Sequence, residues 1–209
     1  MDSYSNLLTI AAVSLLAAIS PGPDFCIVVR NSLSFSRKSG LLTALGVSLA
    51  LMVHLFYTLV GIGVLIAESP VVYTLLKYTG VGYLFYLGLN SLLASFKNAP
   101  RLELEYADSF KDMPPLTALR QGFLTNLLNP KAALFFISLF AQLIDIHTPL
   151  LIKLEYAFIN WSIGLAWFLA LVFLITSEGI IKKISHARLY IDRVMGSALM
   201  LLGLKLLIA

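Results

Sequence analysis

Six runs of mostly apolar residues occupy nearly the whole chain, and each is long enough to cross a lipid bilayer as a helix. A hydrocarbon core about 30 Å thick needs about 20 such residues. Apolar residues make up 59% of the 209 residues and charged residues only 12%, which is about half the charged fraction of an ordinary soluble domain. Backbone in lipid must satisfy its own hydrogen bonds, so we expect an all-α integral membrane protein with six transmembrane helices in one bundle. The runs cover approximately residues 7–29, 41–67, 71–96, 119–143, 151–176 and 189–209.

The positions of the cationic side chains predict how these helices are oriented. Of the fifteen Lys and Arg residues, eleven lie in or next to the first, third and fifth connections, whereas the opposite side holds only Lys77, Lys153 and Lys205. Positively charged connections stay in the cytoplasm. We therefore expect both termini to be periplasmic. The formal net charge of +4 then reflects orientation in a membrane, and we expect no nucleic-acid partner.

Two sequence matches divide the chain into related halves. Ser20-Pro21 in the first run parallels Asn129-Pro130 in the fourth, and a Leu-Gly-Leu segment at 87–89 recurs at 202–204. The polar stretch 97–115 separates three runs from three, and halves with an odd number of spans are inverted relative to each other, as in many secondary transporters. We expect one transmembrane transporter domain over residues 1–209, built from two inverted three-helix repeats. Repeat 1 covers about 1–96, the cytoplasmic linker about 97–118 and repeat 2 about 119–209.

Prolines interrupt two of the runs near the middle of the membrane. Pro21 and Pro23 interrupt the first run, and Pro130 interrupts the fourth. Proline removes a backbone donor and disrupts the preceding turn, so we expect helices 1 and 4 to be broken there. Each restarted helix then directs free backbone amides and the positive end of its dipole at the midplane, which suits a carboxylate. Ordinary kinks are the alternative, but breaks at corresponding positions of two repeats favour a transport site.

Asp24 and Lys131 lie beside these breaks, inside the predicted spans. An ionisable group at that depth costs at least about 2.5 kcal/mol unless it is paired or hydrated, so we expect neither side chain to face lipid. A cation in the first turn of a helix also opposes the helix dipole and needs a nearby anion. Either the two residues form a purely structural pair, or a zwitterion or a proton exchanges with that pair. In the second interpretation Asp24 is the proton-coupling residue and Lys131 takes a substrate carboxylate.

Other polar residues within the runs complete the predicted site. His54 lies at the centre of the second run, where a side chain that titrates near neutral pH suits proton coupling or substrate contact. The alternative is a hydrogen-bonded packing residue. Asn160 in the fifth run is the approximate counterpart of His54 in the second repeat and is expected to line the same cavity. The predicted substrate-binding residues are Gly22, His54, Asn126, Asn129, Lys131 and Asn160.

Motifs that identify common enzymes are missing from the sequence. It contains no HExxH, GxSxG or P-loop motif, and its His, Cys and Asp residues lack the spacing of metal ligands. We therefore expect neither an enzyme nor an ATP-driven pump, and we expect no cofactor and no metal centre.

Motifs spread along the chain carry a resemblance to a known family. They are Ser20-Pro21-Gly22-Pro23-Asp24, Arg37-Lys38 with Gly40, Gly46 with His54, Gly61-x-Gly63, Gly80-x-Gly82-Tyr83-Leu84 with Leu87-Gly88, and Gly122-x-x-x-Asn126-x-x-Asn129-Pro130-Lys131. Together they resemble the LysE/RhtB superfamily, the lysine exporter and homoserine/threonine resistance type of amino-acid efflux protein. The run from Ser20 to Phe25 looks most like the threonine-efflux branch. The resemblance implies proton-driven efflux of an amino acid or derivative across the bacterial inner membrane.

The substrate is the least determined part of this prediction, because members of the superfamily also export basic amino acids, cysteine-related compounds and metal ions. The spans offer few further acids to hold a cationic side chain, so we expect small neutral amino acids such as threonine or homoserine. A metal-ion or other small-solute exporter is the alternative, although Asp24, Cys26 and His54 form a thin ligand set. A membrane assembly subunit without transport activity is another. The expected partners are the amino acid, protons and the bilayer, with a homo-oligomer as a further option.

Overall fold

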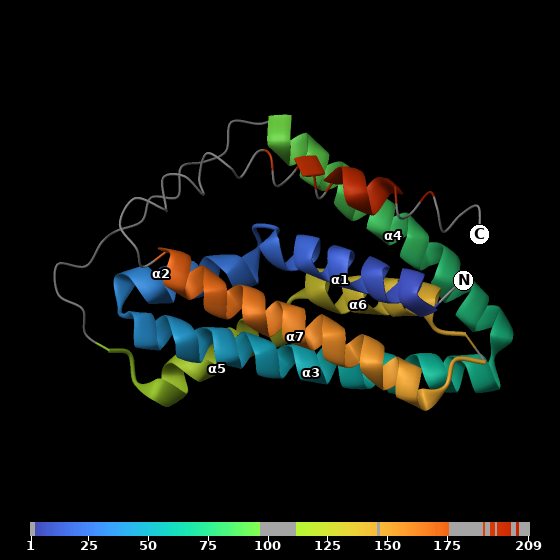
Figure 1. Cartoon of the computed structure of the whole chain (residues 1–209), viewed down its shortest axis with the longest axis horizontal. Coiled ribbons are helices and arrows are strands. Elements are labelled where there is room, and N and C mark those ends of the chain that lie inside the picture. The colour runs from blue at the N-terminus through green and yellow to red at the C-terminus, as the bar shows by residue number, and fades with distance from the viewer. Residues whose placement is uncertain are drawn as a thin grey trace.

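The computed structural model describes residues 3–96, 112–145 and 147–175, together with 190, 193–194, 196–201 and 204. Regular structure in these residues is entirely α-helical, as the sequence predicts (Figure 1). The first half contains α1 (Ser3–Ile19), α2 (Pro23–Ser34), α3 (Arg37–Glu68) and α4 (Pro70–Phe96). The second half contains α5 (Pro115–Leu127), α6 (Pro130–Leu143) and α7 (Leu150–Ile175).

The described helices account for five of the predicted runs. α3 and α7 are each long and apolar enough to cross a membrane, and the pairs α1–α2 and α5–α6 each qualify when their two helices are counted as one broken span. Two to four candidate spans can therefore be counted in the described residues. α4 occupies the third predicted run, whereas most of the sixth run and most of the 97–118 linker lie outside the described residues. Six transmembrane helices in two inverted repeats stay a prediction.

The chain bends sharply at both proline segments. The angle between α1 and α2 is 55°, and the angle between α5 and α6 is 56°. α2 begins with Pro23 and α6 with Pro130. Proline is well tolerated at the first position of a helix, because that position has no helical partner for a backbone N–H. The prolines therefore end one helix and start the next, and they do so at similar angles in both halves.

Two glycines allow α3 and α5 to pack backbone against backbone. A Cβ atom added to Gly46 in α3 would lie 2.0 Å from the carbonyl oxygen of Leu119 in α5. A Cβ atom added to Gly122 in α5 would lie 2.0 Å from the carbonyl oxygen of Thr43 in α3. Small residues permit such close approach between helices in a membrane, where van der Waals packing drives association. This crossing fixes α5, and with it the break at Pro130, against the longest helix of the bundle.

α4 lies across one side of the bundle, next to the described residues near the C-terminus (Figure 1). A Cβ atom on Gly88 would lie 2.7 Å from the carbonyl oxygen of Gly196, and one on Gly196 would lie 2.6 Å from the carbonyl oxygen of Gly88. On another part of α4, a Cβ atom on Gly80 would lie 3.1 Å from the Cα of Ser138 in α6. Glycines therefore let α4 approach both α6 and the C-terminal segment closely.

The outer surface of α3 is apolar along its length. Leu45, Leu49, Met52, Phe56 and Val60 are between 40% and 70% exposed. They recur every three or four residues, so they form one continuous stripe on the helix. A soluble protein rarely exposes such a stripe to water, whereas lipid tails cover it without cost. Together with the apolar spans, the stripe indicates a multi-pass membrane protein.

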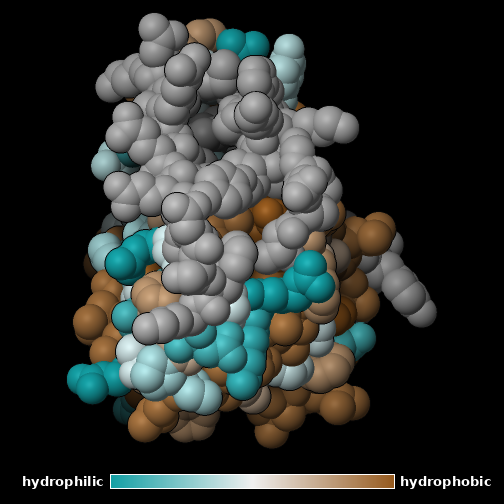
Figure 2. Space-filling model, turned by 90° about the vertical axis from the view of Figure 1, so that its left-hand side faces the viewer, coloured by the Kyte–Doolittle hydropathy of each residue, from teal (hydrophilic) through white to brown (hydrophobic). Residues whose placement is uncertain are grey.

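Hydrophilic side chains gather at the end of the bundle where α2 ends and α3 and α5 begin (Figure 2). The exposed cations of these three helices include Arg30, Arg37, Lys38 and Arg120. These are cations that the sequence analysis assigns to the cytoplasm, and the fold brings them to one end of the molecule. The arrangement agrees with the predicted orientation without testing it.

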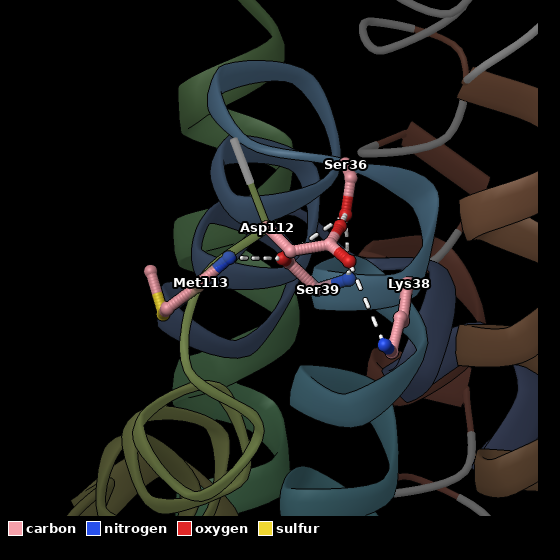
Figure 3. Close-up of polar contacts among 5 residues, drawn as sticks. All are labelled: Ser36, Lys38, Ser39, Asp112 and Met113. Atoms are coloured by element: carbon pink, nitrogen blue, oxygen red, sulfur yellow. Dashed lines mark hydrogen bonds and ion pairs between the residues drawn. The ribbon is translucent and has the colours of Figure 1, made fainter. Parts of the chain in front are cut away.

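A small polar cluster joins the α2–α3 corner to the segment that leads into α5 (Figure 3). The Ser36 hydroxyl accepts the backbone N–H of Ser39 at 3.1 Å and donates to Asp112. Lys38 lies 3.5 Å from the Asp112 carboxylate, and the backbone N–H of Met113 donates to the Ser39 hydroxyl at 2.9 Å. The hydrogen bond from Ser36, followed by the charge of Lys38, holds the pKa of Asp112 below its ordinary value. Asp112 therefore stays ionised at neutral pH, and the start of the second half stays attached to the first.

Candidate transport site

A cavity of about 80 Å³ lies between the two helix breaks. One buried water needs about 10–15 Å³ by this measure, so the cavity has room for roughly five to eight groups of that size, which is the scale of a small amino acid. Residues from both halves of the chain line it. The wall contains most of the predicted substrate-binding and proton-coupling residues, namely Gly22, Asp24, Asn126, Asn129, Lys131 and Asn160. It does not contain His54.

Asp24 reaches from the first break to the second. Its Oδ2 atom accepts hydrogen bonds from the side-chain nitrogens of Asn126 and Asn129, each at 3.0 Å. Asn126 lies in the last turn of α5, before the Pro130 break, and Asn129 lies within the break. Hydrogen bonds to an ionised acceptor are among the stronger ones in proteins. The carboxylate of the first half of the chain is therefore held by side-chain amides of the second half.

Asn129 also starts α6. Its Oδ1 atom accepts the backbone N–H of Lys131 at 3.0 Å, and its backbone is extended with φ −81° and ψ 104°. This is the geometry of an N-cap, in which a side-chain oxygen satisfies an orphan amide of the first turn. At the other break Gly22 occupies the N-cap position of α2 and has no side chain to do the same. The two breaks are thus capped differently.

Lys131 reaches in the opposite direction, from the second break to the first. Its Nζ atom donates to the Ser20 hydroxyl at 3.0 Å, and a Cβ atom on Gly22 would lie 3.7 Å from that Nζ atom. Lys131 is also close enough to Asp24 for their charges to interact. The ammonium group therefore lies beside the start of α2, where a glycine leaves room for it.

His54 contacts a backbone carbonyl beside the second proline break. In a continuous helix the carbonyl of Asn126 accepts the N–H of residue 130, but Pro130 has none, and the carbonyl accepts the N–H of Asn129 at 2.9 Å instead. His54 Nε2 lies 3.0 Å from this oxygen. Because a carbonyl can only accept, Nε2 carries a proton, and in the neutral imidazole Nδ1 then accepts from the Tyr57 hydroxyl. Only 1% of His54 is exposed. The sequence left open two roles for His54, either proton coupling or substrate contact, or hydrogen-bonded packing. This geometry favours the packing role.

Asn160 lines the cavity from α7. Its side-chain nitrogen donates to the Ser14 hydroxyl of α1 at 2.6 Å, and both residues are in the cavity wall. The neighbouring Trp161 instead donates its indole N–H to the carbonyl oxygen of Ser48 at 3.2 Å and ties α7 to α3. The predicted placement of Asn160 beside the cavity agrees with the structure, while Trp161 lies outside the wall.

Most of the cavity's apolar wall was not predicted from the sequence. Phe135, Phe136, Phe168 and Leu87 line it together with Gly164. Apolar residues occur throughout every span, so nothing in the sequence marks these few. Ser14, Ala17 and Ala18 of α1 also line the cavity. Their three- and four-residue spacing places small side chains on one helix face, and this signal was available.

Cys26 and Asp24 do not point the same way. Cys26 is exposed, whereas Asp24 lines the cavity. Within the described part of the chain, no group of three or more His, Cys, Asp or Glu side chains is placed to hold a metal ion. The charged groups in the described wall of the cavity are Asp24 and Lys131.

Comparison with known proteins identifies the family of this chain. Residues 15–209 match the LysE type translocator family. The chain belongs to this family. The LysE type translocators are transport proteins rather than enzymes, and they are membrane proteins, which fits the apolar spans described above.

Two curated relatives of this LysE type translocator match most of its length. It is 29% identical over 204 residues to the uncharacterized membrane protein YrhP of Bacillus subtilis (strain 168), a match that covers 96% of this chain and 97% of the relative. It is 31% identical over 144 residues to the leucine efflux protein of Salmonella typhimurium (strain LT2), a match that covers 69% of this chain and 66% of the relative. No solved structure matches the chain.

Proposed function

We propose that this LysE type translocator exports small neutral amino acids or close derivatives, such as threonine or homoserine, across the bacterial inner membrane. The observation that carries the proposal is the cavity between the breaks, whose described wall contains one carboxylate, Asp24, and one ammonium group, Lys131. A zwitterion needs one partner of each sign, and a neutral side chain needs no further charge. The relative named leucine efflux protein supports an amino acid as the cargo.

The substrate carboxylate binds at the start of α6 in this proposal. The positive end of the helix dipole and the Lys131 ammonium group both favour an anion there. Lys131 donates to the neutral Ser20 hydroxyl in this structure, and an incoming carboxylate is the stronger acceptor. Asn129 keeps the first turn of α6 in place through its N-cap bond. Gly22 leaves room for the carboxylate beside Lys131, and Asn160 bounds the cavity on the side of α7.

Asp24 is the proposed proton-coupling residue of an amino-acid/proton antiporter. Asn126 and Asn129 hold its carboxylate at the cavity wall, and carboxylates at membrane depth commonly serve as proton relays in transporters. We propose that His54 acts one step away, by fixing Asn126 from behind the cavity wall. Loss or gain of the proton on Asp24 then changes the charge that the substrate meets.

The arrangement of helices supports the proposed inverted repeat. In such a repeat α1, α2 and α3 correspond to α5, α6 and α7. The contact of α1 with α7 then has its counterpart in the contact of α5 with α3, and the contact of α2 with α7 has its counterpart in the contact of α6 with α3. Each of these helix pairs is in contact, and the two bends are similar. We propose two inverted three-helix repeats with periplasmic termini, which move against each other around the cavity.

A second candidate substrate class is favoured by the cavity wall. Phe135, Phe136, Phe168 and Leu87 give it a large apolar surface, which suits a branched aliphatic side chain such as that of leucine. The threonine-like and leucine-like proposals share the zwitterion site and differ only in the side chain of the substrate.

Uptake into everted membrane vesicles tests the proposal. Vesicles with an acidic lumen that contain the overproduced protein should accumulate radiolabelled threonine, homoserine or leucine above vesicles without it, and unlabelled competitors should rank the three. Accumulation of a divalent cation instead would establish the metal-exporter alternative. Purified protein that produces no flux of any of these solutes in liposomes would support the assembly-subunit alternative and contradict the proposal.

A further inference from the structure

Two buried oxygen atoms at the cavity have no hydrogen-bond donor within the described part of the chain. They are Oδ1 of Asp24 and Oδ1 of Asn126, and both residues are in the cavity wall. Only 1% of Asn126 is exposed. Buried acceptors without donors are rare and unfavourable in native proteins. Two such atoms beside one cavity therefore indicate a ligand that brings its own donors.

The orientation of both side chains is fixed by their other atoms. The Asn126 side-chain nitrogen donates to Asp24 Oδ2 at 3.0 Å. A carboxylate can only accept, so this bond decides which end of the amide is nitrogen and leaves its oxygen as the open acceptor. Asn129 donates to the same Asp24 oxygen at 3.0 Å. The backbone carbonyl of Asn126 is also held, by His54 Nε2 at 3.0 Å. The open acceptors therefore belong to a rigid assembly.

The chemistry of these atoms selects the ligand group. A carboxylate oxygen and an amide oxygen accept hydrogen bonds, and the carboxylate adds negative charge. A primary ammonium group carries three N–H donors and a positive charge, so it matches both. The cavity's own ammonium group, on Lys131, donates to Ser20 at the other break. The cavity thus has an acceptor side at Asp24 and Asn126 and a donor side at Lys131.

We propose that Asp24 Oδ1, with Asn126 Oδ1 as a second acceptor, binds the α-ammonium group of the substrate and makes the transporter specific for a free α-amino group. This inference rests on the proposed function, because it assigns the second charged group of the same zwitterion. It separates amino acids from hydroxy acids, which have the same carboxylate and side chain but no ammonium group. It also gives Asp24 a contact with substrate in addition to its proposed proton.

Binding of matched analogues to the purified protein tests the inference. One series compares L-leucine with 2-hydroxy-4-methylpentanoate and 3-methylbutylamine, and a parallel series compares L-threonine with 2,3-dihydroxybutanoate. Isothermal titration calorimetry on the wild-type protein should show the preferred amino acid binding roughly 100-fold more tightly than its hydroxy acid, because the analogue leaves Asp24 and Asn126 unpaired. Equal affinity of an amino acid and its hydroxy acid for the wild-type protein would overturn the inference without any variant.

Asp24→Asn provides the second measurement. It should weaken amino-acid binding to the level of the hydroxy acid and leave hydroxy-acid binding unchanged, because the donor side at Lys131 is intact. Glu155→Gln, which removes an exposed carboxylate of α7 outside the cavity wall, should retain the 100-fold preference. If Asp24→Asn does not fold, Asn126→Ala should lose part of the preference. Persistence of the full preference in a folded Asp24→Asn protein would contradict the inference.

Failure of the proposed function gives a different result. In that case no amino acid binds in either series and none is transported into vesicles. If amino acids bind and are transported but the hydroxy acids bind equally well, the proposed function stands and only the ammonium assignment fails.

Discussion

Asn129 uses both ends of its side-chain amide, and each end does a different task. The oxygen caps α6 by accepting the N–H of Lys131, and the nitrogen donates to Asp24 across the cavity. Aspartate or serine at this position can cap a helix, but neither offers an N–H donor to a carboxylate. Asparagine is therefore suited both to restarting the helix and to holding the charge of the other half.

Substitution of Asn129 separates these two tasks. Asn129→Ser retains a capping oxygen, so we expect its melting temperature in detergent to stay close to that of the wild type while transport falls. Asn129→Ala loses the cap as well and should be less stable by about 1 kcal/mol. Thermal unfolding and vesicle uptake of the two variants check this. Equal transport by Asn129→Ser and the wild type would show that the bond to Asp24 has no part in transport.

Lys131 is the residue whose charge the proposed carboxylate site needs most. Removing it in Lys131→Ala should raise the half-saturation concentration for substrate by about 10-fold or more, since hydrogen bonds to charged groups contribute about 1.5–3 kcal/mol. Protein abundance in the membrane should change much less. Lys153→Ala, which removes a cation of α7 outside the cavity wall, is the control and should leave half-saturation unchanged. An unchanged half-saturation in Lys131→Ala would refute the assignment.

At the scale of helices, the crossing of α3 and α5 positions the second break. Gly46 and Gly122 each face a backbone carbonyl of the other helix, so the separation of the two helices is set by glycine. Even a single methyl group at either position is too large for this separation. His54 on the same α3 then reaches the Asn126 carbonyl at the end of α5.

Gly46→Ala should therefore damage the fold, because the added methyl group meets backbone that cannot move aside. Overpacking of this kind costs about 1–3 kcal/mol, and we expect a lower melting temperature and less protein in the membrane. Gly63→Ala in the same helix is the matched control, since a Cβ atom there meets nothing within 4 Å. The prediction is wrong if the two variants have equal melting temperatures.

At the scale of the whole molecule, the fold divides into parts that the sequence predicts and parts that it does not. The prolines indicate where the helices bend, because proline acts through its own backbone. His54 contacts Asn126, which lies 72 residues further along the chain. Asp24 binds Asn126 and Asn129, which lie 102 and 105 residues further along. Only the folded chain therefore identifies these partners. The apolar cavity wall was unpredictable because its residues resemble those that face lipid. Most of the sixth run and most of the linker lie outside the described residues, so the proposed second repeat is described only in part.

The orientation of the molecule can be tested by cysteine labelling. In a Cys26→Ser background, Lys38→Cys lies at the cationic end that we expect in the cytoplasm, and His147→Cys lies in the connection between α6 and α7 that we expect in the periplasm. An impermeant thiol reagent added to intact cells should label only the cysteine at position 147. Labelling at position 38 in intact cells would reverse the proposed topology. A cysteine at Lys111, which lies outside the described residues, should behave like the one at position 38.

We propose that Asp24 couples substrate movement to protons at the junction of the two halves. If Asp24 were only the structural partner of Lys131, Asp24→Asn would destabilise the protein, and a second change that removes the charge of Lys131 would restore both stability and transport. If Asp24 carries the proton, its replacement removes the titrating group while the cavity and its bonds to Asn126 and Asn129 can persist.

The most direct measurement is uptake of labelled amino acid by liposomes that contain purified Asp24→Asn protein, at a substrate concentration high enough to offset weaker binding. We predict that an acidic lumen drives accumulation by the wild type, and that Asp24→Asn exchanges labelled for unlabelled substrate but does not accumulate it in response to the pH gradient. Full gradient-driven accumulation by Asp24→Asn would contradict the account.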